Sequence, residues 1–184
     1  MADMVGIITR YDPGPTDLIG GVSLGAHAAA AYAAETGWSG RLYAVMPAWV
    51  GSPDQVAALT ARTADRIETV GVDDTLADIA SSTAPDDWIF AELRLAWRTM
   101  SRETLARALR VAAAQEAPTA RTLSQVRCRT RVVGLADDPT HPLSVAQVWT
   151  DSIAHARLHV LARDLDGGDT TVLASPLRTF RADG

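Results

Sequence analysis

A serine flanked by glycines, Gly21-Val22-Ser23-Leu24-Gly25, is the segment of this chain best suited to chemistry. An apolar run, 18–22, precedes it, and an alanine-rich run without helix breakers, 26–35, follows it. This order predicts a buried strand, a tight turn and a helix, with the Ser23 hydroxyl raised above the sheet as a nucleophile. We expect side chains at Gly21 and Gly25 to collide across so tight a turn, and Ser23 to hold unfavourable dihedrals.

The helix after this turn would present its free N–H groups and its positive dipole end to a developing oxyanion. We expect the Leu24 amide to be the first oxyanion donor. The alternative for the motif is a glycine-rich strand-to-helix turn with an incidental serine. A dinucleotide-binding turn fits less well, because Gly20, Gly21 and Gly25 do not have the G-x-G-x-x-G spacing.

A second candidate group follows the apolar run 130–135, in Ala136-Asp137-Asp138-Pro139-Thr140-His141. An acid just past the carboxyl end of a parallel strand lies at the sheet edge where ligands bind. Asp137 and Asp138 are therefore both candidate catalytic acids. The alternative for Asp138 is a turn-forming Asp-Pro pair that caps a helix beginning near Pro142.

The chain has four histidines that could serve as a general base. His27 lies one helical turn after Ser23 and is expected to face along the helix instead of toward the seryl oxygen. His141 closely follows Asp138 and is the preferred base, with a solvated position at the start of a helix as its alternative. His155 and His159 are expected at the surface.

Composition excludes several classes of function. The 184 residues include 47% hydrophobic residues and carry a net charge of -5, typical of one globular domain. The 17 basic residues form no patch, which argues against nucleic acid as a partner. No stretch suits a membrane span or a signal peptide, so the expected location is cytoplasmic. No metal-ligand spacing or nucleotide motif appears, so we expect no metal and no cofactor.

The single cysteine, Cys128, excludes an intramolecular disulfide and fits a reducing compartment. It lies between Arg127 and Arg129, which could lower the pKa of its thiol. We favour a half-buried thiol at a strand edge.

The elements that must position these residues alternate between strand and helix, which predicts parallel strands with helices on both faces. The predicted strands are 18–22, 42–46, 130–135 and 156–161, and the predicted helices are 2–11, 26–35, 142–153 and 170–180. Between them lie four predicted helices, near 53–70, 73–81, 86–99 and 101–115, with Ser101 as an N-cap.

The Ser23 turn, the helical middle and the Asp138 strand end occur in an order that resembles the C-terminal part of an α/β-hydrolase, in which the serine turn is called the nucleophile elbow. The resemblance covers nearly the whole chain, from the helix before the elbow to the last helix. It implies an α/β fold of about four mainly parallel strands with an inserted helical cap. The corresponding segments are 1–51 (elbow part of the core), 52–120 (cap) and 121–184 (C-terminal part of the core).

The chain departs from the family pattern in two places. Where the family has Gly-His after the last strand, this sequence has Gly168-Asp169, and a carboxylate makes a poor general base at neutral pH. The strands that precede the elbow in the family are also missing, which would leave the elbow strand as an exposed sheet edge. A gene start placed too late, a degenerate fragment, or an edge covered by a partner or a second copy would each explain this.

The resemblance implies hydrolysis of an ester or related acyl bond, with Ser23 as nucleophile. It also implies that Asp138, the acid directly before Pro139, orients the base, with Asp137 as second choice. The segment Met46-Pro47-Ala48-Trp49 is expected at the mouth of the site, with Pro47 and Trp49 contacting a small apolar substrate. The alternatives are a non-catalytic relative that binds a ligand or partner, a fragment of a longer hydrolase, and a lyase or cyclase without an acyl-enzyme.

Overall fold

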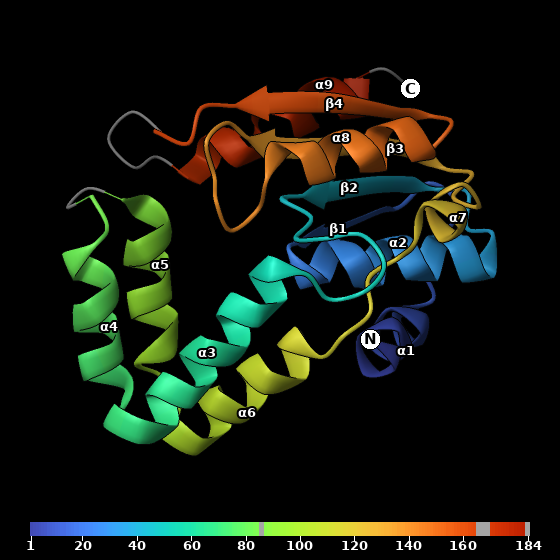
Figure 1. The fold of residues 1–184 in the computed structure, drawn as a ribbon. Coiled ribbons are helices and arrows are strands. Elements are labelled where there is room, and N and C mark those ends of the chain that lie inside the picture. Colours follow the sequence, from blue (N-terminus) through green and yellow to red (C-terminus); the bar gives the residue numbers. More distant parts are fainter. Residues whose placement is uncertain (85–86, 165–169, 183–184) are drawn as a thin grey trace. The chain divides into compact units, whose positions relative to one another are not determined.

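A computed structural model describes residues 1–84, 87–164 and 170–182 (Figure 1). The described strands are β1 (Leu18–Val22), β2 (Arg41–Val45), β3 (Arg129–Leu135) and β4 (Ala156–Leu161). The helices are α1 (Ala2–Tyr11), α2 (Leu24–Thr36), α3 (Gln55–Val70), α4 (Val72–Ser81), α5 (Trp88–Trp97), α6 (Arg102–Ala113), α7 (Ala120–Leu123), α8 (Leu143–Ser152) and α9 (Ser175–Ala182), with a 3-10 helix, η2 (Thr170–Ala174).

The four described strands form one parallel sheet in the order β1-β2-β3-β4, which confirms the predicted fold class. Helices α2 and α8 pack on one face of this sheet, with α7 between them and α1 outside α2. Helix α9 packs on β3 from the other face (Figure 1). Side chains therefore alternate along β2: Leu42 and Ala44 enter the core beneath α2, while the Tyr43 hydroxyl donates to the Leu173 carbonyl of η2.

Helix α2 is alanine-rich because it is enclosed on nearly every side. All of its residues from Ala26 to Ala33 are buried, between the sheet and helices α1 and α7. A helix enclosed in this way has no polar face, so its sequence lacks amphipathic periodicity. The large side chains of this core come mainly from neighbouring elements, including Leu42, Leu123 and Trp149.

The structure also differs from the sequence predictions in several element bounds. Helix α2 begins at Leu24, two residues earlier than predicted, so that the helix starts directly after Ser23. Helix α7 was not predicted, because four residues are too few to show periodicity. The predicted last helix is divided into the 3-10 helix η2 and helix α9, which begins at Ser175.

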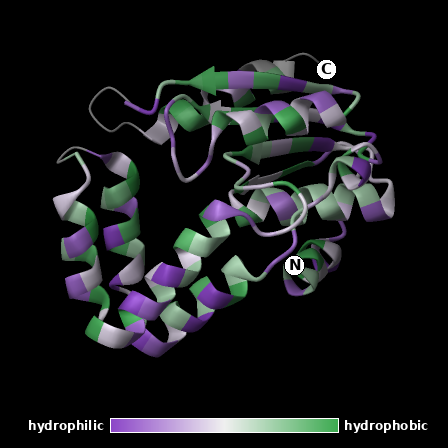
Figure 2. Cartoon of the chain, viewed as in Figure 1, coloured by the Kyte–Doolittle hydropathy of each residue, from purple (hydrophilic) through white to green (hydrophobic). Residues whose placement is uncertain are grey.

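The contacts divide the chain into two units. One contains Met1–Pro53, Glu116–Arg163 and the described residues after 170, and therefore the whole described sheet. The other contains Asp54–Gln115 with helices α3 to α6, along which hydrophilic and hydrophobic residues alternate (Figure 2). This helical unit has its own buried core, made by Ile67, Leu76, Trp97, Leu105 and Ala106. Ser101 accepts a hydrogen bond from the Thr104 amide, which confirms it as an N-cap.

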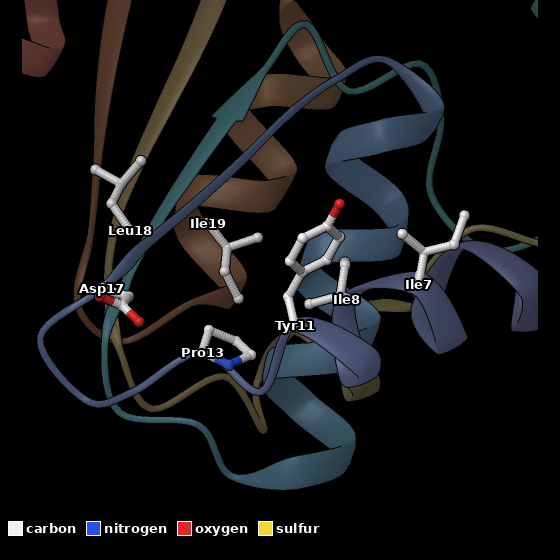
Figure 3. Close-up of a pocket in the computed structure, with 7 residues that line it drawn as sticks. All are labelled: Ile7, Ile8, Tyr11, Pro13, Asp17, Leu18 and Ile19. Atoms are coloured by element: carbon white, nitrogen blue, oxygen red, sulfur yellow. The ribbon is translucent and has the colours of Figure 1, made fainter.

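Strand β1, which leads to Ser23, forms one edge of the described sheet, as expected from the sequence. A hollow of about 630 Å³ lies beside it, formed with α1 and the connecting loop (Figure 3). Its lining residues are Ile7, Ile8, Tyr11, Pro13, Asp17, Leu18 and Ile19. Coverage of this edge by a partner or a second copy stays a prediction.

None of the helices in the described part of the chain combines the length and hydropathy needed to cross a bilayer.

Candidate active site

Three turns meet at the carboxyl ends of β1, β2 and β3, and each contains a non-glycine residue with positive φ. These residues are Ser23 (φ 54°), Met46 (φ 48°) and Asp137 (φ 57°). The sheet hydrogen bonding continues into two of the turns, since the Ser23 amide donates to the Val45 carbonyl and the Met46 amide to the Val133 carbonyl. Strained backbone of this kind is typical of functional sites and persists only where the surroundings enforce it.

The glycines around Ser23 have different roles. A Cβ atom at Gly21 would lie 2.1 Å from the Gly25 carbonyl carbon and 2.5 Å from the Ala26 nitrogen, so only glycine fits there. A Cβ atom at Gly25 would meet nothing within 4 Å. The expected collision is therefore confirmed at Gly21 and wrong at Gly25, because the close approach is between Gly21 and the backbone of Gly25.

Ser23, His141 and Asp138 form a continuous chain of hydrogen-bonding groups. His141 Nε2 lies 3.1 Å from Ser23 Oγ, and His141 Nδ1 lies 3.1 Å from Asp138 Oδ2. A carboxylate only accepts hydrogen bonds, so the proton of the neutral imidazole is assigned to Nδ1. Nε2 is then free to accept the proton of the Ser23 hydroxyl. This spacing is within reach for proton transfer between a nucleophile and its base.

The acid of this chain is Asp138, whose side chain is fully buried, while Asp137 is exposed. Burial alone would raise the pKa of Asp138, but hydrogen bonds from His141 and Thr140 outweigh it and hold that pKa well below its ordinary value. The alternative role as a helix cap is wrong, because α8 has no side-chain cap. Asp138 instead accepts from the Thr140 amide at 2.9 Å, within its own turn.

His27 is buried, and its hydrogen bond is with the main chain instead of the Ser23 hydroxyl. Its Nε2 accepts a hydrogen bond of 3.1 Å from the Ala48 amide, which joins α2 to the segment after β2. Its ring packs edge-on against Trp49 and at a tilt against Trp149. Burial, with a smaller effect from nearby His141, lowers the pKa of His27 from 6.5 to about 4, so it is neutral at physiological pH.

Trp49 packs against this buried histidine, and Pro47 also lies in the interior. Trp49 is 3% exposed, and Pro47 is among the fully buried side chains. In this conformation neither offers surface to a ligand, so their substrate-binding role stays a prediction. Leu24 is the first residue of α2. The residue four positions before it, Gly20, belongs to β1, so the Leu24 amide has no acceptor within the helix.

Cys128 is 2% exposed, immediately before β3. Burial raises the pKa of its thiol, so a thiol activated by Arg127 and Arg129 is the wrong interpretation.

Sequence reasoning missed two partners of Asp138. Thr140 donates its hydroxyl to Asp138 Oδ1 at 2.7 Å, and Arg163 donates from Nη1 to the same oxygen at 2.9 Å. The spacing of two residues from Asp138 could have indicated Thr140, since aspartate often accepts from the amide two residues on. No local signal indicates Arg163.

Asp169, at the family's histidine position, lies outside the described residues. Within the ranges that are described, no three His, Cys, Asp or Glu side chains come together as a metal site.

Comparison with known proteins gives similarity at the level of structure alone. No family model and no curated protein matches the chain. A solved carboxylesterase structure from Nitrososphaera gargenis matches with a TM-score of 0.76 and 16% identity, covering 98% of this chain and 71% of that one. An esterase from Exiguobacterium antarcticum matches at 0.73 and 15%, with coverage of 98% and 71%. MenH from S. aureus matches at 0.72 and 14%, with coverage of 99% and 73%.

These matches extend over nearly the whole chain, and the described sheet is parallel as in the predicted architecture. The protein therefore has a partial α/β-hydrolase fold, which confirms the resemblance drawn from the sequence.

Proposed function

We propose that this protein is a serine hydrolase that cleaves an ester or related acyl bond. The observation that carries the proposal is the pair of 3.1 Å contacts joining Ser23 Oγ to His141 and His141 to Asp138. The solved structures that resemble the chain include three esterases, which supports the same reaction class. A small apolar acyl compound stays the predicted substrate.

In the proposed reaction, His141 Nε2 accepts the Ser23 hydroxyl proton as Ser23 Oγ bonds to the acyl carbon. The oxyanion that forms is stabilised by the Leu24 amide at the positive end of α2. His141 then returns the proton to the leaving alcohol as the bond to it breaks, leaving an acyl-Ser23 ester. Water, deprotonated by His141, attacks this ester and releases the acid with free Ser23.

Asp138 keeps His141 in the tautomer that this sequence of steps needs. Because hydrogen bonds hold the pKa of Asp138 low, the carboxylate stays ionised throughout and stabilises the imidazolium that forms in each step. The base in this proposal follows the acid by three residues and lies before α8, so both groups belong to one loop between β3 and α8.

The proposal is tested with a fluorophosphonate probe and a p-nitrophenyl butyrate assay on the full chain. We expect labelling and turnover in the wild type, and loss of both in Ser23→Ala. His141→Ala should lower kcat/KM by about 10³-fold or more. His155→Ala is the matched control, since His155 is exposed and directly precedes β4, at the opposite end of the strands from the site, and it should keep full activity.

Absence of labelling in correctly folded wild type would overturn the proposal and favour a non-catalytic relative that binds a ligand. Labelling that persists in Ser23→Ala would place the nucleophile elsewhere. Ester hydrolysis that survives in Ser23→Ala would mean that the reaction does not pass through an acyl-Ser23 intermediate.

A further inference from the structure

Arg163 contacts Asp138, the acid of the candidate site, and the proposed reaction gives this contact no role. Its Nη1 donates to Asp138 Oδ1 at 2.9 Å, while Asp138 Oδ2 faces His141. Oδ1 also accepts from the amide and the hydroxyl of Thr140. One oxygen of the carboxylate is therefore held by three donors, and the other oxygen is left for the imidazole.

The sheet register explains why an arginine so distant in sequence reaches this acid. In the parallel pair of β3 and β4, Leu135 lies opposite Leu161, so both strands end at the same level. Asp138 follows three residues after the end of β3, and Arg163 follows two residues after the end of β4. Arg163 and Asp138 therefore meet just beyond the two strand ends, at the same edge of the sheet as Ser23.

The burial of the two partners makes the contact strong. The Asp138 side chain is fully buried and the Arg163 side chain is 25% exposed, so water screens the pair only in part. A charge-assisted hydrogen bond in such surroundings fixes geometry more firmly than an exposed ion pair does. The guanidinium also offsets part of the carboxylate charge that would otherwise act on His141 alone.

We propose that Arg163 is a positioning residue, which orients the Asp138 carboxylate toward His141 and sets the pH range in which His141 acts as a base. This inference rests on the proposed hydrolase function. Among the described residues, His141 interacts with Asp138 in its own loop and with His27 on α2, and Asp138 pairs with Arg163 after β4. Of these groups, His27 is neutral over the working pH range, so the charges that act on His141 are those of Asp138 and Arg163.

Two effects should follow when the guanidinium is removed. Asp138 Oδ1 loses one of its three donors and the carboxylate becomes less ordered, which lowers kcat more than it changes KM. The negative charge acting on His141 becomes less compensated, so protonated His141 is favoured. The acidic limb of the pH–rate profile should then move to higher pH by about one unit.

The experiment compares Arg163→Met, Arg163→Gln and Arg163→Lys with the wild type, measuring kcat and KM for p-nitrophenyl butyrate from pH 5 to 9. Arg163→Met and Arg163→Gln should both show the shifted limb, because both lack the charge. Arg163→Lys should keep the limb near its wild-type position. Arg157→Met, which removes an exposed arginine of β4, is the matched control and should leave the limb unchanged.

Circular dichroism and fluorophosphonate labelling of Ser23 separate the outcomes. Absence of labelling in the wild type would mean that the proposed function fails. Normal wild-type labelling, with an unshifted limb in folded Arg163→Gln and Arg163→Met, would overturn the inference on Arg163 alone. Loss of the fold in all three variants would assign Arg163 a structural role and would equally overturn it.

Discussion

At the scale of single residues, the site depends on side chains that their neighbours hold in one conformation. Ser23 holds φ 54° and ψ −117°, a conformation that costs a non-glycine residue about 1–3 kcal/mol. In return, the adjacent helix and strand place its Oγ 3.1 Å from His141. His141 is in turn fixed by Asp138, whose carboxylate is fully buried. The strain at Ser23 is thus offset by packing elsewhere in the fold.

The buried His27 predicts how the stability of the folded protein changes in acid. An unfolded chain binds a proton at His27 near pH 6.5, whereas the folded protein binds it only near pH 4, where the lowered pKa lies. The unfolded state is therefore favoured progressively as pH falls through this window, and the stability is complete only above it. A shift of this size corresponds to about 3 kcal/mol.

We expect the free energy of unfolding, measured by urea denaturation, to fall less between pH 6.5 and pH 4 in His27→Gln than in the wild type. His155→Gln is the control, because that side chain is exposed, and it should retain the wild-type slope. Equal slopes in the wild type and His27→Gln would show that another group causes the acid sensitivity.

At the scale of elements, the turn between β1 and α2 is set by one backbone contact. Helix α2 begins at Leu24, directly after Ser23, so the first turn of the helix passes close to the end of the strand. The backbone of Gly25 occupies the space that a Cβ atom at Gly21 would need, and this contact fixes the angle at which the helix leaves the sheet. Glycine is required at position 21, whereas position 25 has room for a Cβ atom.

Gly21→Ala and Gly25→Ala test this difference as a matched pair. We expect Gly21→Ala to lower the free energy of unfolding by more than about 2 kcal/mol, because its Cβ overlaps backbone atoms that cannot give way. Gly25→Ala should leave it unchanged or raise it by up to about 1 kcal/mol, since alanine favours a helix. Chemical denaturation of both variants measures this, and equal losses would contradict the one-sided contact.

At the scale of the whole molecule, the chain has two units with separate buried cores. Leu42 is fully buried in the unit that contains the sheet, and Ile67 is fully buried in the unit of helices α3 to α6. Each core is assembled from its own segments, so a cavity made in one removes contacts from that unit first.

We therefore expect Ile67→Ala to increase hydrogen exchange in 55–113 while amides of β2 and β3 stay protected. Leu42→Ala should increase exchange in the sheet instead. Each substitution should cost about 2–5 kcal/mol in its own unit. Exchange measured by mass spectrometry distinguishes the two, and the same rise in both units for both variants would mean that they unfold together.

The sequence by itself determined the four described strands and helices α1, α2 and α8 of the sheet unit, the turn at Ser23 and the place of Asp138. These follow from short-range patterns: apolar runs, glycine at a crowded turn, and an acid at a strand end, where parallel topology brings such ends to one edge. His141 was preferred as the base from its proximity to Asp138, and its 3.1 Å distances to both partners could be seen only in the fold.

Other features were decided by tertiary structure alone. Arg163 meets Asp138 because β3 and β4 pair in one particular register, which no local pattern encodes. Trp49 is buried against His27 instead of facing a substrate, because the packing of α2 and α8 around it determines which way an aromatic side chain turns. Chemistry that depends on neighbours in the sequence was predictable, while contacts between distant segments depend on how the whole sheet unit packs.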